Sequence, residues 1–246
     1  MRVGHFLCID VGNSRTKIAI FKKERPIYKD TLDTLDLVAL QGLFDRFPIS
    51  HSILCQVKNV KKPIKDYLRK HSVYKEMGLH LKLPVTIMYR PPESLGKDRL
   101  AAVCGAVRLY PDQDMLIIGI GTCITYDFVN AKSCYLGGSI SPGLDMRLKA
   151  MHAFTARLPL VESRLDVGLT AKDTVASLQS GAVWGIQSEL AGIIGLYLSK
   201  YPDIQVILCG GGAKFYKNRL KKTIFALPNL VTLGLNGILI LNVQNT

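Results

Sequence analysis

The stretch from His5 to Phe21, HFLCIDVGNSRTKIAIF, decides the fold. An apolar run ends at Asp10, a Gly-Asn-Ser turn follows, and a second apolar run begins after Lys17. Short apolar runs joined by a glycine-containing turn predict a hairpin of two strands. The polar residues of this turn further predict that the hairpin holds phosphate.

Each polar residue of the turn suits a task on a polyphosphate. Gly12 lacks the Cβ that would keep phosphate away from the backbone, and Asn13 and Ser14 offer amide and hydroxyl donors. Lys17 adds a compact positive charge. Asp10, at the end of the incoming strand, is placed to hold a hydrated Mg²⁺ ion through its carboxylate. Ordinary turns use the same residue types, so the segment by itself also fits a plain hairpin.

A second copy of the pattern lies further along the chain. Residues 115–129, MLIIGIGTCITYDFV, repeat the order of apolar strand, glycine, small hydroxyl residue and apolar strand. Gly121 corresponds to Gly12, 109 residues earlier, and this spacing indicates a duplicated half-molecule because solenoid repeats are much shorter. Neither copy contains GxxxxGK[ST], and neither is a GxGxxG segment leading into a helix.

Two phosphate hairpins that face each other are the arrangement of the acetate and sugar kinase, Hsp70 and actin superfamily. Resemblance to that superfamily predicts an α/β fold of two similar RNase H-like halves, the actin-like ATPase fold, with an active-site cleft between them.

Seven segments at compatible spacing extend the resemblance to almost the whole chain. They are DVGNSRTK at 10–17, YRPPESLGKDR at 89–99, GTCITYD at 121–127, GGSISPGL at 137–144, TARLPLVE at 155–162, TVASLQSG at 174–181 and CGGGAK at 209–214. In this order they resemble the type III pantothenate kinases. The resemblance implies ATP-dependent phosphorylation of pantothenate to 4'-phosphopantothenate, the first step of coenzyme A biosynthesis.

The resemblance also implies which residues bind the substrates. For ATP they are Asp10, Gly12, Asn13, Ser14, Arg15, Thr16, Lys17, Gly121, Thr122, Gly210 and Gly211, with Asp10 as a ligand of the Mg²⁺ that accompanies ATP. For pantothenate they are Tyr89, Gly96, Lys97, Asp98, Arg99 and Thr174. Lys97 fills a variable position of the motif, so only a backbone contact is expected of it.

Asp98 is the candidate catalytic base. Phosphoryl transfer to an alcohol needs a group that accepts the hydroxyl proton, and an aspartate in the first turn of a helix suits this task, with Arg99 beside it to hold an anionic acceptor. Acidic residues are common at helix starts, so local sequence alone favours an Asp98 that only complements the helix dipole. The resemblance reverses that preference, because the GxDR segment of the family supplies the base.

Tyr89 and Thr174 are assigned to the acceptor pocket by the resemblance. Taken alone, a tyrosine at the end of an apolar strand fits a core or rim position, and Thr174 fits the N-terminus of a helix. In the family this threonine reaches the acceptor bound to the partner subunit. The resemblance therefore implies a homodimer with its pockets at or near the interface.

One departure from the family concerns Gly119. The family usually carries an aspartate there, at the position that corresponds internally to Asp10, and that aspartate is associated with a monovalent-cation site. Glycine removes both a charge and an oxygen ligand. We therefore expect the K⁺ or NH₄⁺ site of the family to be weakened or filled by water in this chain.

Composition is that of a globular chain, with 246 residues, 48% of them hydrophobic, and a net charge of +13. The lysines are dispersed, with no aromatic-interleaved basic stripe, so we expect no nucleic-acid partner. Six cysteines without CxxC spacing predict reduced core residues and a cytoplasmic protein. The apolar run LVTLGLNGILILNV is broken by glycine and asparagine before it reaches the length of a membrane span, and no signal peptide is expected.

Hydrophobic periodicity predicts the order of the elements. Strands are expected near 4–10, 16–22, 51–56, 114–120, 123–129, 133–137 and 204–209, and helices at 35–47, 61–71, 93–109, 144–153 and 173–200. The division into halves is expected near Pro111. Residues 1–111 would carry the first hairpin and the acceptor-site loop, and residues 112–246 the second hairpin and the nucleoside loop.

Two other functions stay open on the sequence. A non-catalytic regulatory or transcriptional accessory protein could keep the same fold, although intact Asp10, Asp98 and Arg99 argue against it. A related kinase could phosphorylate another small hydroxy acid, because the walls of the acceptor pocket are not visible in a sequence.

Overall fold

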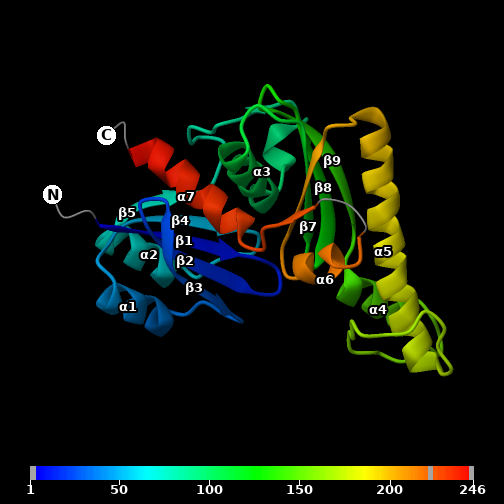
Figure 1. Cartoon of the computed structure of the whole chain (residues 1–246). Helices are drawn as coiled ribbons and strands as arrows, with labels where there is room; N and C mark the ends of the chain where they lie inside the picture. Colours follow the sequence, from blue (N-terminus) through cyan, green and yellow to red (C-terminus); the bar gives the residue numbers. More distant parts are fainter. Residues whose placement is uncertain (1–3, 221–223, 244–246) are drawn as a thin grey trace. The chain divides into compact units, whose positions relative to one another are not determined.

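The computed structural model describes residues 4–220 and 224–243, and Figure 1 draws their helices and strands, most of them labelled. The chain divides into two compact units. The first unit holds the described residues up to Asp112, with Lys132–Leu136 and those from Asn229 onward. The second unit holds the described residues of Gln113–Ala131 and Gly137–Pro228. The sequence division at residue 111 assigned the C-terminal segment to the second half, whereas here it belongs to the first unit.

The first unit is built on a five-stranded sheet in the order β3-β2-β1-β4-β5. Its strands are β1 His5–Val11, β2 Thr16–Lys22, β3 Arg25–Leu32, β4 Ile49–Gln56 and β5 Val73–Glu76. β1 pairs antiparallel with β2 and parallel with β4, and its last five residues are all buried. An almost continuous apolar strand is expected where both faces of a sheet are covered.

Two helices of the first unit, α1 Leu37–Arg46 and α2 Lys62–His71, bury their apolar sides in the same core as the sheet. α1 begins at Asp36, whose side chain accepts a hydrogen bond from the Ala39 amide at 2.7 Å. This cap satisfies one of the amides that the first turn of a helix leaves unpaired.

Helices α3 Lys97–Leu109 and α7 Leu230–Val243 pack tightly against each other in the first unit. A Cβ on Gly234 would lie only 1.8 Å from the carbonyl oxygen of Ala101, and one on Gly105 would lie 2.7 Å from that of Leu230. Glycines at the crossing therefore let the two backbones touch. The apolar C-terminal run is thus a buried helix. Among the described helices, none has the length and apolarity to cross a membrane.

The remaining elements of the first unit are short: β6 Thr86–Ile87 and the 3₁₀ helix η1 Pro92–Ser94. β6 pairs in parallel with Cys134 and Tyr135, the first residues of β9. The region expected as one helix from 93 to 109 is divided, because η1 ends before Gly96 and α3 begins after it.

The second unit contains β7 Met115–Ile120, β8 Cys123–Val129, the later part of β9 Cys134–Pro142, α4 Leu144–Ala153, α5 Thr174–Lys200, β10 Gln205–Cys209, α6 Ala213–Lys217 and β11 Phe225–Ala226. Its strands follow the order β11-β10-β7-β8-β9. The long helix α5 buries Ile186, Leu190 and Ile194 in a core shared with β7, β8 and β10. Those side chains recur every four residues, as on the buried side of an amphipathic helix.

The two units repeat one strand order. In the first unit a hairpin of β1 and β2 is followed by β3, and β4 and β5 add in parallel on the other side of β1. In the second unit β7 and β8 form the hairpin, β9 follows, and β10 and β11 add in parallel beside β7. The duplication inferred from the two glycine turns is therefore confirmed in the topology.

Candidate functional site

Asp10 is the most unusual polar residue of the first unit. It is only 6% exposed, and its Oδ1 atom has no hydrogen-bond partner among the described residues. The pKa of Asp10 is raised to about 6: burial raises it most, the positive charge of Lys17 lowers it, and the negative charge of Asp98 raises it. A buried carboxylate oxygen without a hydrogen-bond partner costs free energy. Such an oxygen fits a metal ion.

The hairpin that follows Asp10 has the expected form. The Gly12 amide donates to the Arg15 carbonyl at 3.0 Å, and a Cβ on Gly12 would lie 3.1 Å from that oxygen. Lys17 pairs with Asp10 across the two strands. Asn13, Ser14 and Arg15 are exposed at the tip, whereas Thr16, backbone included, is buried.

A lysine that sequence analysis did not assign lies at this turn. The Lys58 ammonium donates to the Asn13 carbonyl at 3.4 Å. Lys58 follows β4, the parallel neighbour of β1, so the register of the sheet carries its charge to the hairpin. The sequence could have indicated Lys58, because a basic residue just after a neighbouring parallel strand lies at the same edge of the sheet.

Asp98 is brought into the electrostatic environment of Asp10 by the start of α3. Its Oδ1 atom accepts from the Arg99 amide at 2.9 Å, and Gly96 occupies the cap position without a side chain to close the helix. Cys55 pairs with Asp10 in the sheet and is influenced by the charges of both Asp10 and Asp98. Burial raises the pKa of the Cys55 thiol, and the charges of Asp10 and Asp98 raise it further.

Arg99 is held by two tyrosines. It is only 6% exposed, and its Nη2 atom donates to the Tyr135 hydroxyl at 3.1 Å. The guanidinium carbon lies 5.8 Å from the centre of the Tyr89 ring, within the range of a cation–π contact. The rings of Tyr89 and Tyr135 stack with centres 6.2 Å apart. Tyr135 was not among the residues that the sequence predicted.

The hairpin of β7 and β8 carries the second predicted phosphate turn. Its Gly121 amide donates to the Cys123 carbonyl at 3.0 Å, and the Gly143 amide donates to the Thr122 carbonyl at 3.0 Å. A Cβ on Gly143 would come within 2.2 Å of the Gly121 carbonyl oxygen. Gly143 is therefore required for the end of β9 to lie against this turn.

Arg147 and Glu189 hold the segment before Gly143. The Arg147 Nε atom donates to the Pro142 carbonyl at 2.9 Å, and its Nη2 atom donates to both Ser141 and Glu189. The Tyr126 hydroxyl donates to Glu189 at 2.6 Å. Burial disfavours the Glu189 carboxylate, but hydrogen bonds from Tyr126, Ser141 and Arg147 hold its pKa below the usual value.

The glycine segment after β10 lies beside the same turn. Gly210 has a φ of +87°, and a Cβ there would lie 2.5 Å from the Ile120 carbonyl oxygen. The Gly212 amide donates to that oxygen at 3.2 Å. Gly211 has open space where a side chain would project. Gly121, Thr122, Gly210 and Gly211 therefore come together at one end of the second unit's sheet.

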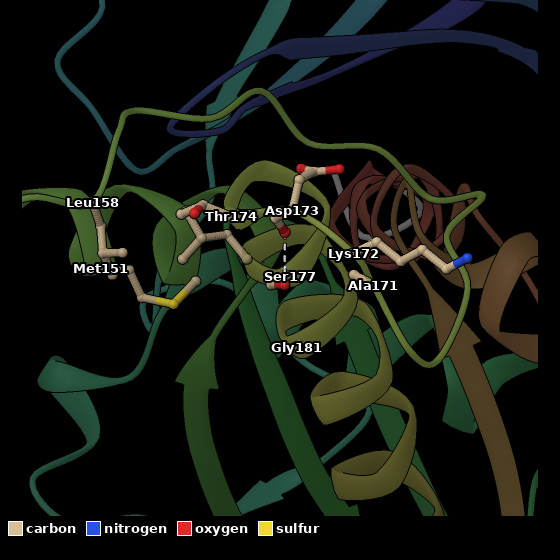
Figure 2. A pocket seen from close by; sticks show the side chains of 9 residues that line it. Met151, Leu158, Ala171, Lys172, Asp173, Thr174, Ser177 and Gly181 are labelled. Carbon is tan, nitrogen blue, oxygen red and sulfur yellow. Dashed lines mark hydrogen bonds between the residues drawn. The ribbon is translucent and has the colours of Figure 1, made fainter.

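Thr174 lies at a separate place in the second unit. It is the first residue of α5, after Asp173, whose side chain accepts from the Ala176 amide at 2.8 Å. Thr174 lines an open pocket of about 540 Å³. Figure 2 shows it beside Ser177, whose hydroxyl donates to the Asp173 carbonyl. The other lining residues are Met151, Leu158, Ala171, Lys172, Asp173, Leu178 and Gly181.

The predicted site residues thus form three groups. Asp10, the first hairpin, Tyr89 and Gly96–Arg99 belong to the first unit. The second hairpin and the glycine segment belong to the second unit, as does Thr174 with its own pocket. Lys58, Tyr135, Arg147 and Glu189 are additional residues that only the structure connects with these groups.

Comparison with known proteins identifies the family. A sequence model described as type III pantothenate kinase matches residues 6–195. A type III pantothenate kinase of Cytophaga hutchinsonii is 40% identical over 239 residues, which cover 96% of this chain and 99% of that protein.

Two solved structures share the fold at low sequence identity. A conserved protein of Campylobacter jejuni assigned to the Baf family of transcriptional activators has a TM-score of 0.57 and 22% identity, over 98% of this chain and 100% of that one. The activator of 2-hydroxyisocaproyl-CoA dehydratase from Clostridium difficile, with bound ADPNP, has a TM-score of 0.52 and 11% identity, over 96% and 94%. The fold is that of the actin-like ATPases and sugar kinases, as the paired hairpins predicted. By its sequence over nearly the full length, the chain belongs to the type III pantothenate kinase family.

Proposed function

We propose that this chain transfers the γ-phosphoryl group of ATP to the primary hydroxyl of pantothenate, giving 4'-phosphopantothenate and ADP, the first step of coenzyme A biosynthesis. Family membership supports the reaction. The single structural observation that carries it is the juxtaposition of Asp10 and Asp98 in the first unit, where each has a different task.

Asp98 is the proposed general base. Its carboxylate accepts the proton of the acceptor hydroxyl while that oxygen bonds to the γ-phosphorus and the bond to the β-phosphate oxygen breaks. The first turn of a helix suits an acidic side chain, because the helix dipole interacts favourably with negative charge there. Tyr89, Gly96, Lys97 and Arg99 form the proposed acceptor site around it.

Asp10 is the proposed protein ligand of Mg²⁺. Its unpaired, buried Oδ1 atom fits this use, and a magnesium ion keeps its other positions for water and phosphate oxygens. When bound, the metal would neutralise charge on the transferring phosphates. The exposed tip of the hairpin, residues 13–15, and the charge of Lys17 bind phosphate, and in the second unit Gly121 and Thr122 do so. Gly210 and Gly211 are proposed to approach the nucleoside.

A bound monovalent cation is not part of the proposal. Gly119 pairs with Thr125 across the second hairpin and occupies the place that Asp10 has in the first. A glycine there supplies neither charge nor side-chain oxygen. We therefore propose that K⁺ and NH₄⁺ are dispensable for this chain.

A homodimer in the cytoplasm completes the proposal. The segment between α4 and α5 presents Phe154, Leu160 and Leu169 at 88%, 62% and 71% exposure, next in sequence to the pocket of Thr174. Exposed large apolar side chains on one segment are typical of an interaction surface. All six cysteines are free thiols, which supports a reducing compartment.

A coupled assay of ADP formation tests the function. Purified protein with Mg²⁺ and ATP is given pantothenate, pantoate, glycerate or no acceptor, and the product is identified by its mass. We expect pantothenate to give the highest kcat/KM and a product heavier by one phosphoryl group. The matched control is Asp98→Asn, which should lose acceptor-dependent turnover. If only another hydroxy acid is turned over, that acid and not pantothenate is the substrate. If the folded protein is inactive with every acceptor, the result favours a regulatory role.

A further inference from the structure

Tyr135 is a buried residue with no role in the proposal above. Its side chain is 0% exposed, although it carries a phenol oxygen. That oxygen accepts a hydrogen bond from the Arg99 guanidinium at 3.1 Å. A hydrogen bond that involves a charged group contributes more than a neutral one, and more again when both partners are shielded from water.

The ring of Tyr135 has a second contact in the acceptor site. It stacks on Tyr89 at 6.2 Å with an angle of 27° between the rings, and the Arg99 guanidinium lies 5.8 Å from the centre of the Tyr89 ring. Tyr135 therefore touches both residues that are proposed to bind the acceptor beside Asp98. The Tyr135 side chain therefore orients both the Arg99 guanidinium and the Tyr89 ring.

The backbone holds Tyr135 in place from the same side. Tyr135 pairs with Ile87 in the short parallel ladder of β6 and β9, and its carbonyl accepts from the Met88 amide at 2.9 Å. Met88 directly precedes Tyr89. The strand that carries Tyr135 and the segment that carries Tyr89 are thus bonded to each other, which limits movement of either ring.

We propose that Tyr135 is a positioning residue for acceptor binding: its hydroxyl directs the Arg99 guanidinium, and its ring supports Tyr89. The inference rests on the proposed function, since it concerns the same acceptor site. It assigns part of the acceptor's affinity to a residue that does not touch the acceptor. A guanidinium has a fixed fork of donors, so a change in its direction alters every contact it makes.

The test is a double-mutant cycle with Tyr135→Phe and Arg99→Lys. Tyr135→Phe keeps the ring and removes the oxygen that Arg99 bonds. We expect the KM for pantothenate to rise about tenfold, on the scale of one hydrogen bond to a charged group, with the KM for ATP unchanged. In the Arg99→Lys background the same change should have little further effect, because the fork that Tyr135 directs is already gone.

Tyr74→Phe is the matched control. Its hydroxyl donates to Glu76 at 3.3 Å within β5 of the same unit, and neither residue belongs to the proposed acceptor site, so pantothenate KM should stay at the wild-type value. Melting temperatures show whether each variant is folded. If Tyr135→Phe does not fold, Tyr135→Met replaces it in the cycle, because a methionine side chain adapts to irregular core space and carries no oxygen for Arg99 to bond.

Three results would overturn the inference: an unchanged pantothenate KM in the folded variant, an equal rise in the KM values for both substrates, or effects that add fully in the double variant. In each case wild-type protein still phosphorylates pantothenate. Failure of the proposed function is a different result, because wild-type protein itself would then show no pantothenate-dependent ADP.

Discussion

Burial and the negative charge of Asp98 together raise the pKa of Asp10 from 3.8 to about 6, against the opposing charge of Lys17. A neighbouring negative charge disfavours the ionised form of a carboxyl group. The arrangement is costly for the fold at neutral pH and suits a protein that receives a divalent cation together with phosphate.

Asp10→Asn should stabilise the metal-free protein at high pH. The folded-state pKa of Asp10 lies above its unfolded value, so the folded state binds the proton more tightly. The cost of ionising Asp10 is therefore fully present above about pH 6 and disappears as the pH falls toward 3.8. A pKa shift of this size corresponds to an increase of up to about 3 kcal/mol in the free energy of unfolding of Asp10→Asn at pH 8, and to almost no increase at pH 4.

Urea unfolding without Mg²⁺ at both pH values measures this gain. Asp45→Asn, at an exposed position of the same unit, should change stability little at either pH. Asp10→Asn should also lose Mg²⁺-dependent turnover. A variant that is less stable than wild type at pH 8 would show that Asp10 has a structural role instead.

Asp98→Asn should lower kcat by about 10² to 10⁴, the usual contribution of a positioned base, while the protein stays folded and binds ATP. Asp145→Asn is the comparison, because Asp145 is likewise an acidic residue in the first turn of a helix, α4. If both residues only complement a helix dipole, both variants lose a little stability and keep turnover. A near-normal kcat in Asp98→Asn would show that Asp98 is not the general base.

Potassium should have little effect on wild-type activity. In a Tris buffer free of sodium and potassium, added K⁺ or NH₄⁺ at constant ionic strength is expected to leave the rate nearly unchanged, because Gly119 provides no side-chain ligand. Gly119→Asp alone should not restore a site, since a Cβ at this position would lie 2.7 Å from the Thr125 hydroxyl oxygen. Strong, saturable activation of the wild type would show that other oxygens form the site.

Glu189→Gln should weaken the use of ATP through the second hairpin. The Glu189 carboxylate fixes Arg147, which holds Pro142 and Ser141 next to Gly143 at the Thr122 turn. We expect kcat/KM for ATP to fall by about tenfold, on the scale of a charged hydrogen bond, with pantothenate KM unchanged. Glu162→Gln, at an exposed position, is the control in steady-state kinetics. Equal changes for both substrates would contradict a role specific to this hairpin.

The sequence by itself determined the elements whose chemistry is local. The hairpin of residues 5–21 could be predicted because an apolar strand, a glycine turn and a second apolar strand are neighbours in the chain. The repeat at Gly121 followed from the same pattern, and the long helix α5 from its hydrophobic period. β3 was missed because it is largely exposed and carries Pro26, so it lacks the apolar run of a buried strand.

Only the tertiary structure decided which distant residues meet. The hydrogen bond between Arg99 and Tyr135, the bond from Lys58 to Asn13 and the return of α7 to the first unit each join segments that are far apart in sequence. Each depends on strand register or on glycines that let backbones touch, and neither property is encoded in one local pattern. The raised pKa of Asp10 likewise depends on the tertiary structure, because burial in the first unit and the charge of Asp98 raise it.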